Sequence, residues 1–237
     1  MTQHVQGWSR VKAGGAFFGG QEPGDVPLYT IAAAARYLRI PESTARWWTK
    51  GRAGDGYEPV LRAVKSSLLS FNDLVELFVV KQLRSFHGVS LDAIRQAVDY
   101  SATVLGVERV LLSHDLSTFG KSVLLTHLGD LVAISHSGQI AMQEIVQGFM
   151  PRVSWSEREF PIGLHPTFLG EESVDGNYPI TLSPLVAFGS PTLYGTGIKT
   201  RVVVARVDAG ETLGQVAEDY GVDPTYVKNA IFFENAA

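Results

Sequence analysis

The chain has 237 residues, of which 45% are hydrophobic and 19% are charged, and its formal net charge is −4. This composition excludes a mainly disordered chain, and the length suggests one or two domains at a typical size of roughly 150 residues. The absence of cysteine excludes disulfide bonds, cysteine-ligated zinc, iron–sulfur clusters and thiol chemistry, and it fits a reducing compartment.

No segment predicts export or a membrane span. Residues 176–198 form the longest run without a charged residue, and this run is long enough for a bilayer, which takes about 20 apolar residues. It contains three prolines and several polar residues, so it predicts strands and turns rather than a membrane helix. The first residues lack the basic and apolar blocks of a signal peptide. We therefore expect a cytoplasmic protein without membrane contact.

The chain begins with a segment unlike the rest. Residues 1–28 hold six glycines and show neither a helical nor a strand period, which predicts a flexible glycine-rich arm. Trp8, Phe17 and Phe18 are unusual in a pure linker. These aromatic residues either dock on the body of the protein or allow the arm to embrace a partner.

Residues 29–106 predict a winged helix-turn-helix DNA-binding domain. Two short helical patterns, at residues 31–38 and 43–50, flank Pro41, and Gly51 ends the second. Residues 54–71 predict a β-ribbon of the length of a wing. Ser70 and Asp73 have the spacing of a capping box before an amphipathic helix, and Ser90 caps the next helix.

The charge distribution favours DNA as the partner of this domain. Residues 29–70 hold seven basic and three acidic residues, an excess of four positive charges in an acidic protein. Double-stranded DNA carries a negative charge about every 1.7 Å, so a duplex-binding protein needs such a cationic face. A solvated cationic face without nucleic acid is the alternative.

Helical spacing assigns roles within the second helix. Ala45 and Trp48 lie three residues apart and are expected to face the core. The N-terminal part of such a helix usually enters the major groove, where Arg46 would contact guanine or a phosphate. Trp47 fits core packing, a DNA contact or an interface. The predicted DNA-binding residues are Ser43, Thr44, Arg46, Trp47 and Lys50, with Lys50, Arg52, Arg62 and Lys65 assigned to phosphates.

Residues 107–166 predict a short mixed α/β segment. Apolar runs at residues 110–112, 123–125 and 131–134 are strand-like, residues 139–149 predict a helix, and residues 161–166 resemble a connection. With the helices on either side, the expected fold class is α+β and mainly helical.

Residues 167–237 predict a small C-terminal domain whose helices again have a helix-turn-helix shape. Short strands precede helices at residues 200–208, 211–220 and 224–233, and Asp223 caps the last one with Pro224 at its first position. Four basic residues stand against nine acidic ones, which favours protein contacts, either dimerisation or partner binding. A second DNA-binding module around Lys199, Arg201 and Lys228 is the alternative.

The sequence contains no set of residues that predicts catalysis. Residues 120–122 resemble the end of a phosphate-binding loop, but Asp115 stands where that loop needs glycine. No pair of histidines has i, i+4 spacing, and the acidic residues show no close pairing of the kind that a two-metal nuclease site needs. We therefore expect a protein that is not an enzyme and has neither a metal site nor a cofactor.

Two groups of residues resemble a known family. The first comprises Tyr29-Thr30-x-x-x-Ala34-Ala35-Arg36-Tyr37-Leu38, Ser43-Thr44-x-Arg46-x-Trp48-x-x-Gly51, Ser70-Phe71-x-Asp73-Leu74-Val75-Glu76-Leu77 and Val89-Ser90-Leu91-x-x-Ile94-Arg95. It is similar to the MerR-like DNA-binding half of VapB-type antitoxins. The second comprises Gly189-x-Pro191-x-x-x-Gly195-Thr196-Gly197-Ile198-x-Thr200, Ala209-Gly210-Glu211 and Asp219-Tyr220-Gly221-Val222. It resembles the signature of the domain of unknown function numbered 433, which ends those antitoxins.

This resemblance implies an antitoxin of a type II toxin–antitoxin pair. Such a protein would repress its own operon as a homodimer or higher oligomer and neutralise a PIN-like ribonuclease toxin. Two other functions stay open on the residues alone. One is an excisionase or DNA-architecture factor of a mobile element, which would use the same basic module without a toxin. The other is an enzyme on a mixed α/β core.

Overall fold

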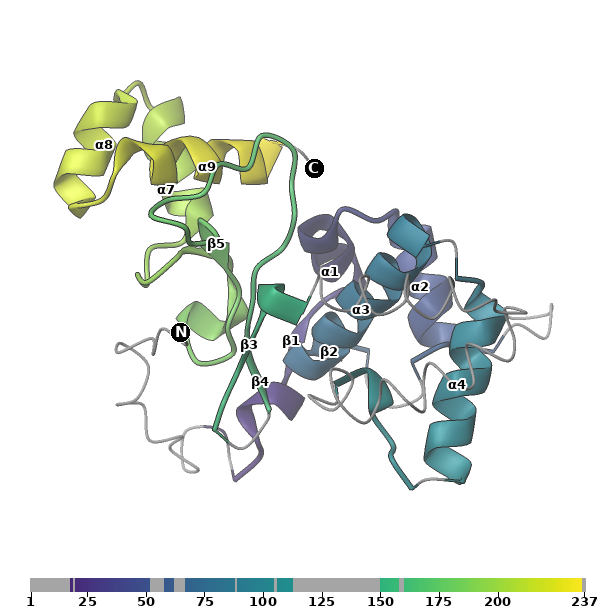
Figure 1. Ribbon diagram of the computed structural model, residues 1–237. Helices are drawn as coiled ribbons and strands as arrows, with labels where there is room; N and C mark the ends of the chain where they lie inside the picture. Colours follow the sequence, from purple (N-terminus) through teal and green to yellow (C-terminus); the bar gives the residue numbers. More distant parts are fainter. Residues whose placement is uncertain are drawn as a thin grey trace.

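The protein combines helices with small antiparallel sheets. The computed structural model describes residues 18, 20–51, 58–61, 67–87, 89–104, 106–112, 150–157 and 160–235. Within these ranges it has seven α-helices and three two-stranded sheets (Figure 1). The expected α+β class is confirmed. No helix in the described part of the chain is long and apolar enough to cross a membrane.

The first two helices have the predicted boundaries within one residue. Helix α1 (Ile31–Leu38) begins at Thr30, whose hydroxyl accepts a hydrogen bond from the Ala33 amide, and ends at a left-handed Arg39. Helix α2 (Glu42–Lys50) begins after Pro41 and ends at Gly51, which has a φ of 72°. Only a three-residue turn separates the helices, so they pack directly on each other.

Helix α3 (Phe71–His87) is the centre of the larger core. Every residue from 71 to 80 is buried, because α1 and several short segments pack against the helix. Helix α4 (Leu91–Thr103) contributes buried residues to the same core. The two capping predictions are confirmed. The Ser70 amide donates to the Asp73 carboxylate at 2.8 Å while the Asp73 amide donates to the Ser70 hydroxyl at 3.1 Å, and the Ser90 hydroxyl accepts from the Ala93 amide.

The segment before α1 is partly structured. A 3₁₀ turn, η1 (Pro23–Asp25), packs against α3, and Asn72 donates a hydrogen bond to the Asp25 carboxylate at 2.8 Å. Strand β1 (Pro27–Tyr29) pairs antiparallel with β2 (Leu69–Ser70). The expected flexible arm therefore has an ordered end at residues 20–28, while residues 1–17 lie outside the described part. The predicted wing, residues 54–71, is described only in part, because residues 52–57 and 62–66 lie outside the described residues. Its strand β2 pairs with β1, which precedes the helix pair, and not with another strand of a β-ribbon.

Two predictions for the middle segment are wrong. Residues 110–112 form a buried 3₁₀ turn, η2 (Val110–Leu112), instead of a strand. Residues 161–164 form strand β4 (Pro161–Leu164) instead of a connection. Strand β4 pairs antiparallel with β3 (Val153–Trp155). The 3₁₀ turn η4 (Met150–Arg152) comes directly before β3. The strands predicted at 123–125 and 131–134 and the helix predicted at 139–149 lie outside the described residues.

The C-terminal unit has its own core. A hairpin of β5 (Ile180–Thr181) and β6 (Thr192–Leu193), with the 3₁₀ turn η5 (Ala187–Gly189) between its strands, precedes α7 (Thr200–Asp208), α8 (Leu213–Tyr220) and α9 (Pro224–Asn235). Thr212 and Gln215 form a capping box on α8, and the Asp223 carboxylate accepts from the Thr225 amide at 2.7 Å, as predicted for the last helix. The buried core residues are Phe168, Ile180, Leu193, Val203, Val216, Ala217, Val227, Ala230 and Phe233.

The two cores meet between α1 and the end of α9 (Figure 1). Tyr37 packs against both, since its ring stacks on Phe233 at 6.3 Å and meets the edge of Tyr29 at 6.3 Å. The Tyr29 hydroxyl donates to the Gly189 carbonyl at 3.1 Å. Burial keeps this hydroxyl protonated by raising its pKa. These contacts hold the C-terminal unit against the first helix pair.

Besides Tyr29, two buried ionisable groups among the described residues, His165 and Glu76, have strongly shifted pKa values. His165 follows β4, and its ring nitrogens hydrogen-bond the Ser154 hydroxyl at 3.2 Å, the Thr181 hydroxyl at 3.0 Å and the Ile180 carbonyl at 3.1 Å. Burial lowers the pKa of this imidazole to about 4.

Glu76 lies on α3 inside the larger core. Its carboxylate and that of Asp73 bind the two terminal nitrogens of Arg109, at 3.2 and 2.9 Å. Burial raises the pKa of Glu76 to about 8, although the Arg109 charge opposes this shift.

Candidate nucleic-acid interface

Helix α2 separates its side chains into a buried and an exposed face. Ala45 and Trp48 are buried, which confirms the prediction from their spacing, and Thr49 is buried beside them. Of the predicted DNA-binding residues, Thr44 is half-buried, and Ser43, Arg46, Trp47 and Lys50 are exposed. Arg52, Arg62 and Lys65 lie outside the described residues. Ser43, Arg46, Trp47 and Lys50 therefore lie along one exposed side of a well-anchored helix.

The anchoring of α2 comes from backbone contacts that the sequence does not reveal. The Trp48 carbonyl accepts hydrogen bonds from the amides of Val60 and Leu61, at 2.8 and 3.0 Å. Val60 and Leu61 are themselves buried in the larger core. The chain that follows α2 thus returns to its C-terminal end, which fixes the helix in the core and leaves its other face to solvent.

Arg46 forms an ion pair on this exposed face. One terminal nitrogen of its guanidinium lies 2.6 Å from the Glu42 carboxylate, one turn earlier, and both side chains are about half-exposed. An exposed i, i+4 ion pair is weak, because water screens the charges and both side chains lose conformational freedom. Glu42 therefore orients Arg46 without preventing it from moving to a stronger anion such as a phosphate.

Trp47 does not pack in the core. Its residue is 42% exposed, so the core-packing alternative is wrong, and a contact with DNA or with a protein partner remains. An exposed indole is costly to keep in water and is frequent at binding surfaces.

Two of the seven basic residues counted in residues 29–70 face α9 and not the exposed side of α2. Arg36 pairs with Glu234 at 3.3 Å, and Arg39 donates to the Phe233 carbonyl and lies over the Phe233 ring. Both therefore contact α9 at the junction between the cores. The excess of four positive charges counted over residues 29–70 therefore overstates the positive charge on the exposed face of α2. Proximity in the sequence alone does not show which side a residue faces.

Residues 167–237 hold nine acidic and four basic residues, and two of the basic residues, on α7 and α9, form ion pairs. Arg206 binds Glu211 and Asp219, and Lys228 binds Glu172 at 2.5 Å. Val202 on α7 and Leu213 at the start of α8 are 43% and 37% exposed. The exposed apolar side chains fit a protein contact. The Lys228–Glu172 pair is about as exposed as the Arg46–Glu42 pair, so it does not argue against a second DNA-binding module.

Comparison with known proteins gives matches at two scales. Residues 180–233, which run from β5 into α9, match a family model described as "Protein of unknown function (DUF433)". Over most of its length the chain is similar to a protein of Mycobacterium tuberculosis named "Putative antitoxin VapB45". The two are 29% identical, and the match covers 87% of this chain and 93% of that protein.

Two further relatives come from the same organism. The "Uncharacterized protein Rv2308" is 24% identical over 87% of this chain and 90% of its own length. The crystal structure of Rv2018 superimposes with a TM-score of 0.68 at 28% identity, covering 87% of this chain and 98% of that chain. The arrangement of helices and small sheets is therefore shared with an experimentally determined structure.

Proposed function

We propose that this protein is an antitoxin of a type II toxin–antitoxin pair, which binds DNA to repress its own operon and neutralises a PIN-like ribonuclease toxin. The observation that carries this proposal is the similarity to a protein named an antitoxin, which extends over nearly the whole of both chains. A DUF433 match at the C-terminal unit accompanies it, in the place where the sequence resemblance puts that domain.

In this proposal, α1 and α2 act as the helix-turn-helix of a MerR-like winged DNA-binding domain. The exposed side of α2, with Ser43, Arg46, Trp47 and Lys50, faces the major groove, and Thr44 lies at its edge. Arg52, Arg62 and Lys65 supply phosphate contacts from the wing. A homodimer or higher oligomer would place two such helices on the two halves of an operator.

The acidic C-terminal unit serves protein contacts. Exposed Val202 and Leu213 provide apolar area on α7 and α8, and the surrounding carboxylates repel DNA. We assign this surface to dimerisation or to the toxin.

A gel-shift salt series with operator DNA tests the DNA-binding face. Arg46→Ala and Lys50→Ala should each weaken binding at least severalfold and reduce the slope of log K against log salt by about one unit if the side chain binds a phosphate. Glu42→Gln should act in the opposite direction, because it removes a repelling carboxylate and releases Arg46. Arg201→Ala, an exposed arginine on α7, is the matched control.

Unchanged binding by both α2 variants, with the fold intact by circular dichroism, would show that the groove assignment is wrong. A loss of binding in Arg201→Ala would instead favour the second DNA-binding module.

The excisionase or DNA-architecture alternative needs the same helix but no toxin. Co-expression with the neighbouring genes followed by pull-down separates the two functions. Recovery of a small PIN-like protein in a stoichiometric complex supports the antitoxin, and DNA bending without any protein partner supports the alternative.

A further inference from the structure

Helix α7 has one buried side and one exposed side. Thr200 and Val203 are buried in the C-terminal unit. The exposed side carries Arg201, Val202, Ala205 and Asp208, together with Ala209, which follows the helix and keeps helical backbone angles. At 3.6 residues per turn, Ala205 is the centre of this exposed side, because Val203 lies about 160° away from it around the helix.

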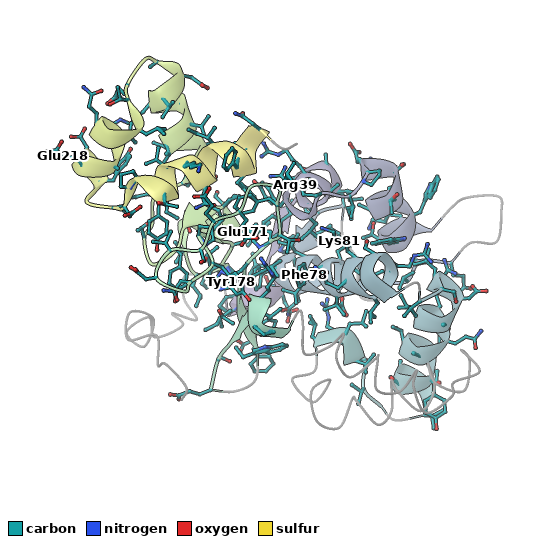
Figure 2. All side chains as sticks on the ribbon, turned by 45° about the horizontal axis from the view of Figure 1, so that its top comes forward. Arg39, Phe78, Lys81, Glu171, Tyr178 and Glu218 are labelled. Carbon is teal, nitrogen blue, oxygen red and sulfur yellow. The ribbon has the colours of Figure 1, made fainter. Side chains whose placement is uncertain are left out.

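Helix α7 lies in the outer part of the molecule. In Figure 1, α7 and α8 are at one end and α4 is at the other. Figure 2 likewise places Glu218 of α8 at the outer end of the C-terminal unit and Arg39 at the junction with the N-terminal helices. A second protein can therefore reach this end of the molecule without contacting α2.

The exposed side of α7 has a charged half and an apolar half. Counted from Ala205, Arg201 and Asp208 lie about 40° and about 60° around the helix in one direction. Ala209 and Val202 lie about 40° and about 60° in the other direction. Val202 is 43% exposed, so the apolar half is open to solvent.

Both charges on this side oppose the helix dipole. Arg201 is the second residue of α7, where the positive helix end favours an anion, and Asp208 is the last, where the negative end favours a cation. Among the described residues, neither side chain has a hydrogen-bond or ion-pair partner. Arg206, by contrast, binds Glu211 and Asp219. The charges of Arg201 and Asp208 are therefore uncompensated within one copy of the chain.

An antiparallel second copy of α7 compensates both charges. A two-fold axis that crosses the helix pair at Ala205 reverses the chain direction and keeps the charged halves on the same side. Arg201 and Asp208 lie about 6 Å and about 4.5 Å from Ala205 along the helix, in opposite directions. Arg201 of each copy therefore meets Asp208 and the negative helix end of the other copy. Val202 meets Ala209 in the same way, whereas a parallel pair would place Arg201 against Val202.

We propose that the exposed side of α7 is a dimer interface, on which a second copy of this chain packs its own α7 antiparallel about Ala205. This inference rests on the homodimer of the proposed function and names the surface that forms it. One nine-residue helix is small beside the about 800 Å² per partner of a standard interface, so the dimer should be reversible and depend on concentration.

Sedimentation velocity of the full chain over a concentration series, without DNA, measures this dimer. Ala205→Glu should abolish it, because the two-fold axis brings two carboxylates together, and Ala205→Lys should do the same with two ammonium groups. An equimolar mixture of these variants should restore the dimer, since opposite charges then meet. Ala32→Glu changes an exposed alanine on α1 and is the matched control, which should dimerise as the unaltered chain does. Circular dichroism checks that each variant is folded.

Reversal of the charges tests the antiparallel direction. Asp208→Arg should raise the dissociation constant of the dimer about tenfold or more, because it brings like charges together at two symmetric places. Adding Arg201→Asp to this variant restores opposite charges at both places. The double variant should therefore dimerise about as well as the unaltered chain, and a double variant that is no better than Asp208→Arg alone would overturn the proposed direction of packing.

A chain that stays monomeric at every concentration overturns the inference, and so does a dimer that persists in Ala205→Glu, because another surface would then join the copies. If the unaltered chain is monomeric and Ala205→Glu loses a toxin in the pull-down, the exposed side of α7 belongs to the toxin instead. A dimer that behaves as expected but binds no operator contradicts the repressor function and not this inference. Since a weaker dimer also lowers operator affinity, a loss of DNA binding in Arg201→Ala indicates a DNA contact only where the dimer persists.

Discussion

Gly189 lies where the C-terminal unit meets the buried Tyr29, and replacing it with alanine tests that packing. Its φ of +71° lies in the left-handed region, and an added Cβ would come within 2.2 Å of the Tyr29 hydroxyl oxygen and 2.8 Å of its Cζ. Tyr29 is only 3% exposed and its ring also meets Tyr37, so it cannot move away without disturbing the core.

The expected loss has two parts. An alanine in the left-handed region costs about 1–2 kcal/mol, and forcing an extra methyl group into a packed site costs typically about 1–3 kcal/mol. Gly189→Ala should therefore lower the free energy of unfolding by about 2–5 kcal/mol. Gly195 provides the matched control, because it has the same φ of +71° but nothing within 4 Å of an added Cβ. Gly195→Ala should cost only the backbone part.

Urea denaturation followed by tryptophan fluorescence measures both losses. Removing the hydroxyl with Tyr29→Phe takes away the closest contact, at the cost of its hydrogen bond to Gly189. In the Tyr29→Phe background, Gly189→Ala should therefore be less damaging than in the unaltered protein. Equal losses for Gly189→Ala and Gly195→Ala would refute the steric reasoning, and so would the absence of coupling between positions 29 and 189.

Two further predictions concern pH. The pKa of His165 falls from 6.5 to about 4 on folding, so its contribution to stability is complete above about pH 6.5 and is lost as the pH falls through 4. Proton NMR of the imidazole should give a titration midpoint near pH 4. A titration midpoint near pH 6.5 would contradict the burial argument. Because the pKa of Glu76 rises from 4.5 to about 8, its contribution is complete below about pH 4.5 and is lost as the pH rises through 8. Urea denaturation between pH 6.5 and 8.5 should show a smaller decline for Glu76→Gln than for the unaltered protein, and parallel declines would show that Glu76 is ionised in the fold.

The sequence predicts best those features that depend on neighbouring residues. Helix α2 begins after Pro41 and ends at Gly51, because a proline and a glycine with positive φ determine the conformation of their own backbone. Helix α3 begins with hydrogen bonds between Ser70 and Asp73, which are only three residues apart. The spacing of Ala45 and Trp48 likewise predicts the buried side of α2, because that side follows from helical geometry alone.

The errors concern features that depend on distant parts of the chain. A short apolar run such as residues 110–112 suits a strand or a buried turn equally, and only its surroundings decide between them. Pairing of β1 with β2 joins segments some forty residues apart, so local pattern favours a separate ribbon instead. The hydrogen bond from Arg39 to Phe233 spans 194 residues, and no local rule predicts that Arg39 faces α9 rather than the exposed side of α2.

The position of Phe233 and Glu234 near the end of α9 makes the surface of the first helix pair depend on the C-terminal unit. Glu234 pairs with Arg36, and Phe233 contacts Arg39 and the ring of Tyr37. Cleavage of the chain before α9 would remove these partners together. A cationic and aromatic surface would then be exposed on the first helix pair, so proteolysis at a distant site would change what this part of the molecule presents to solvent.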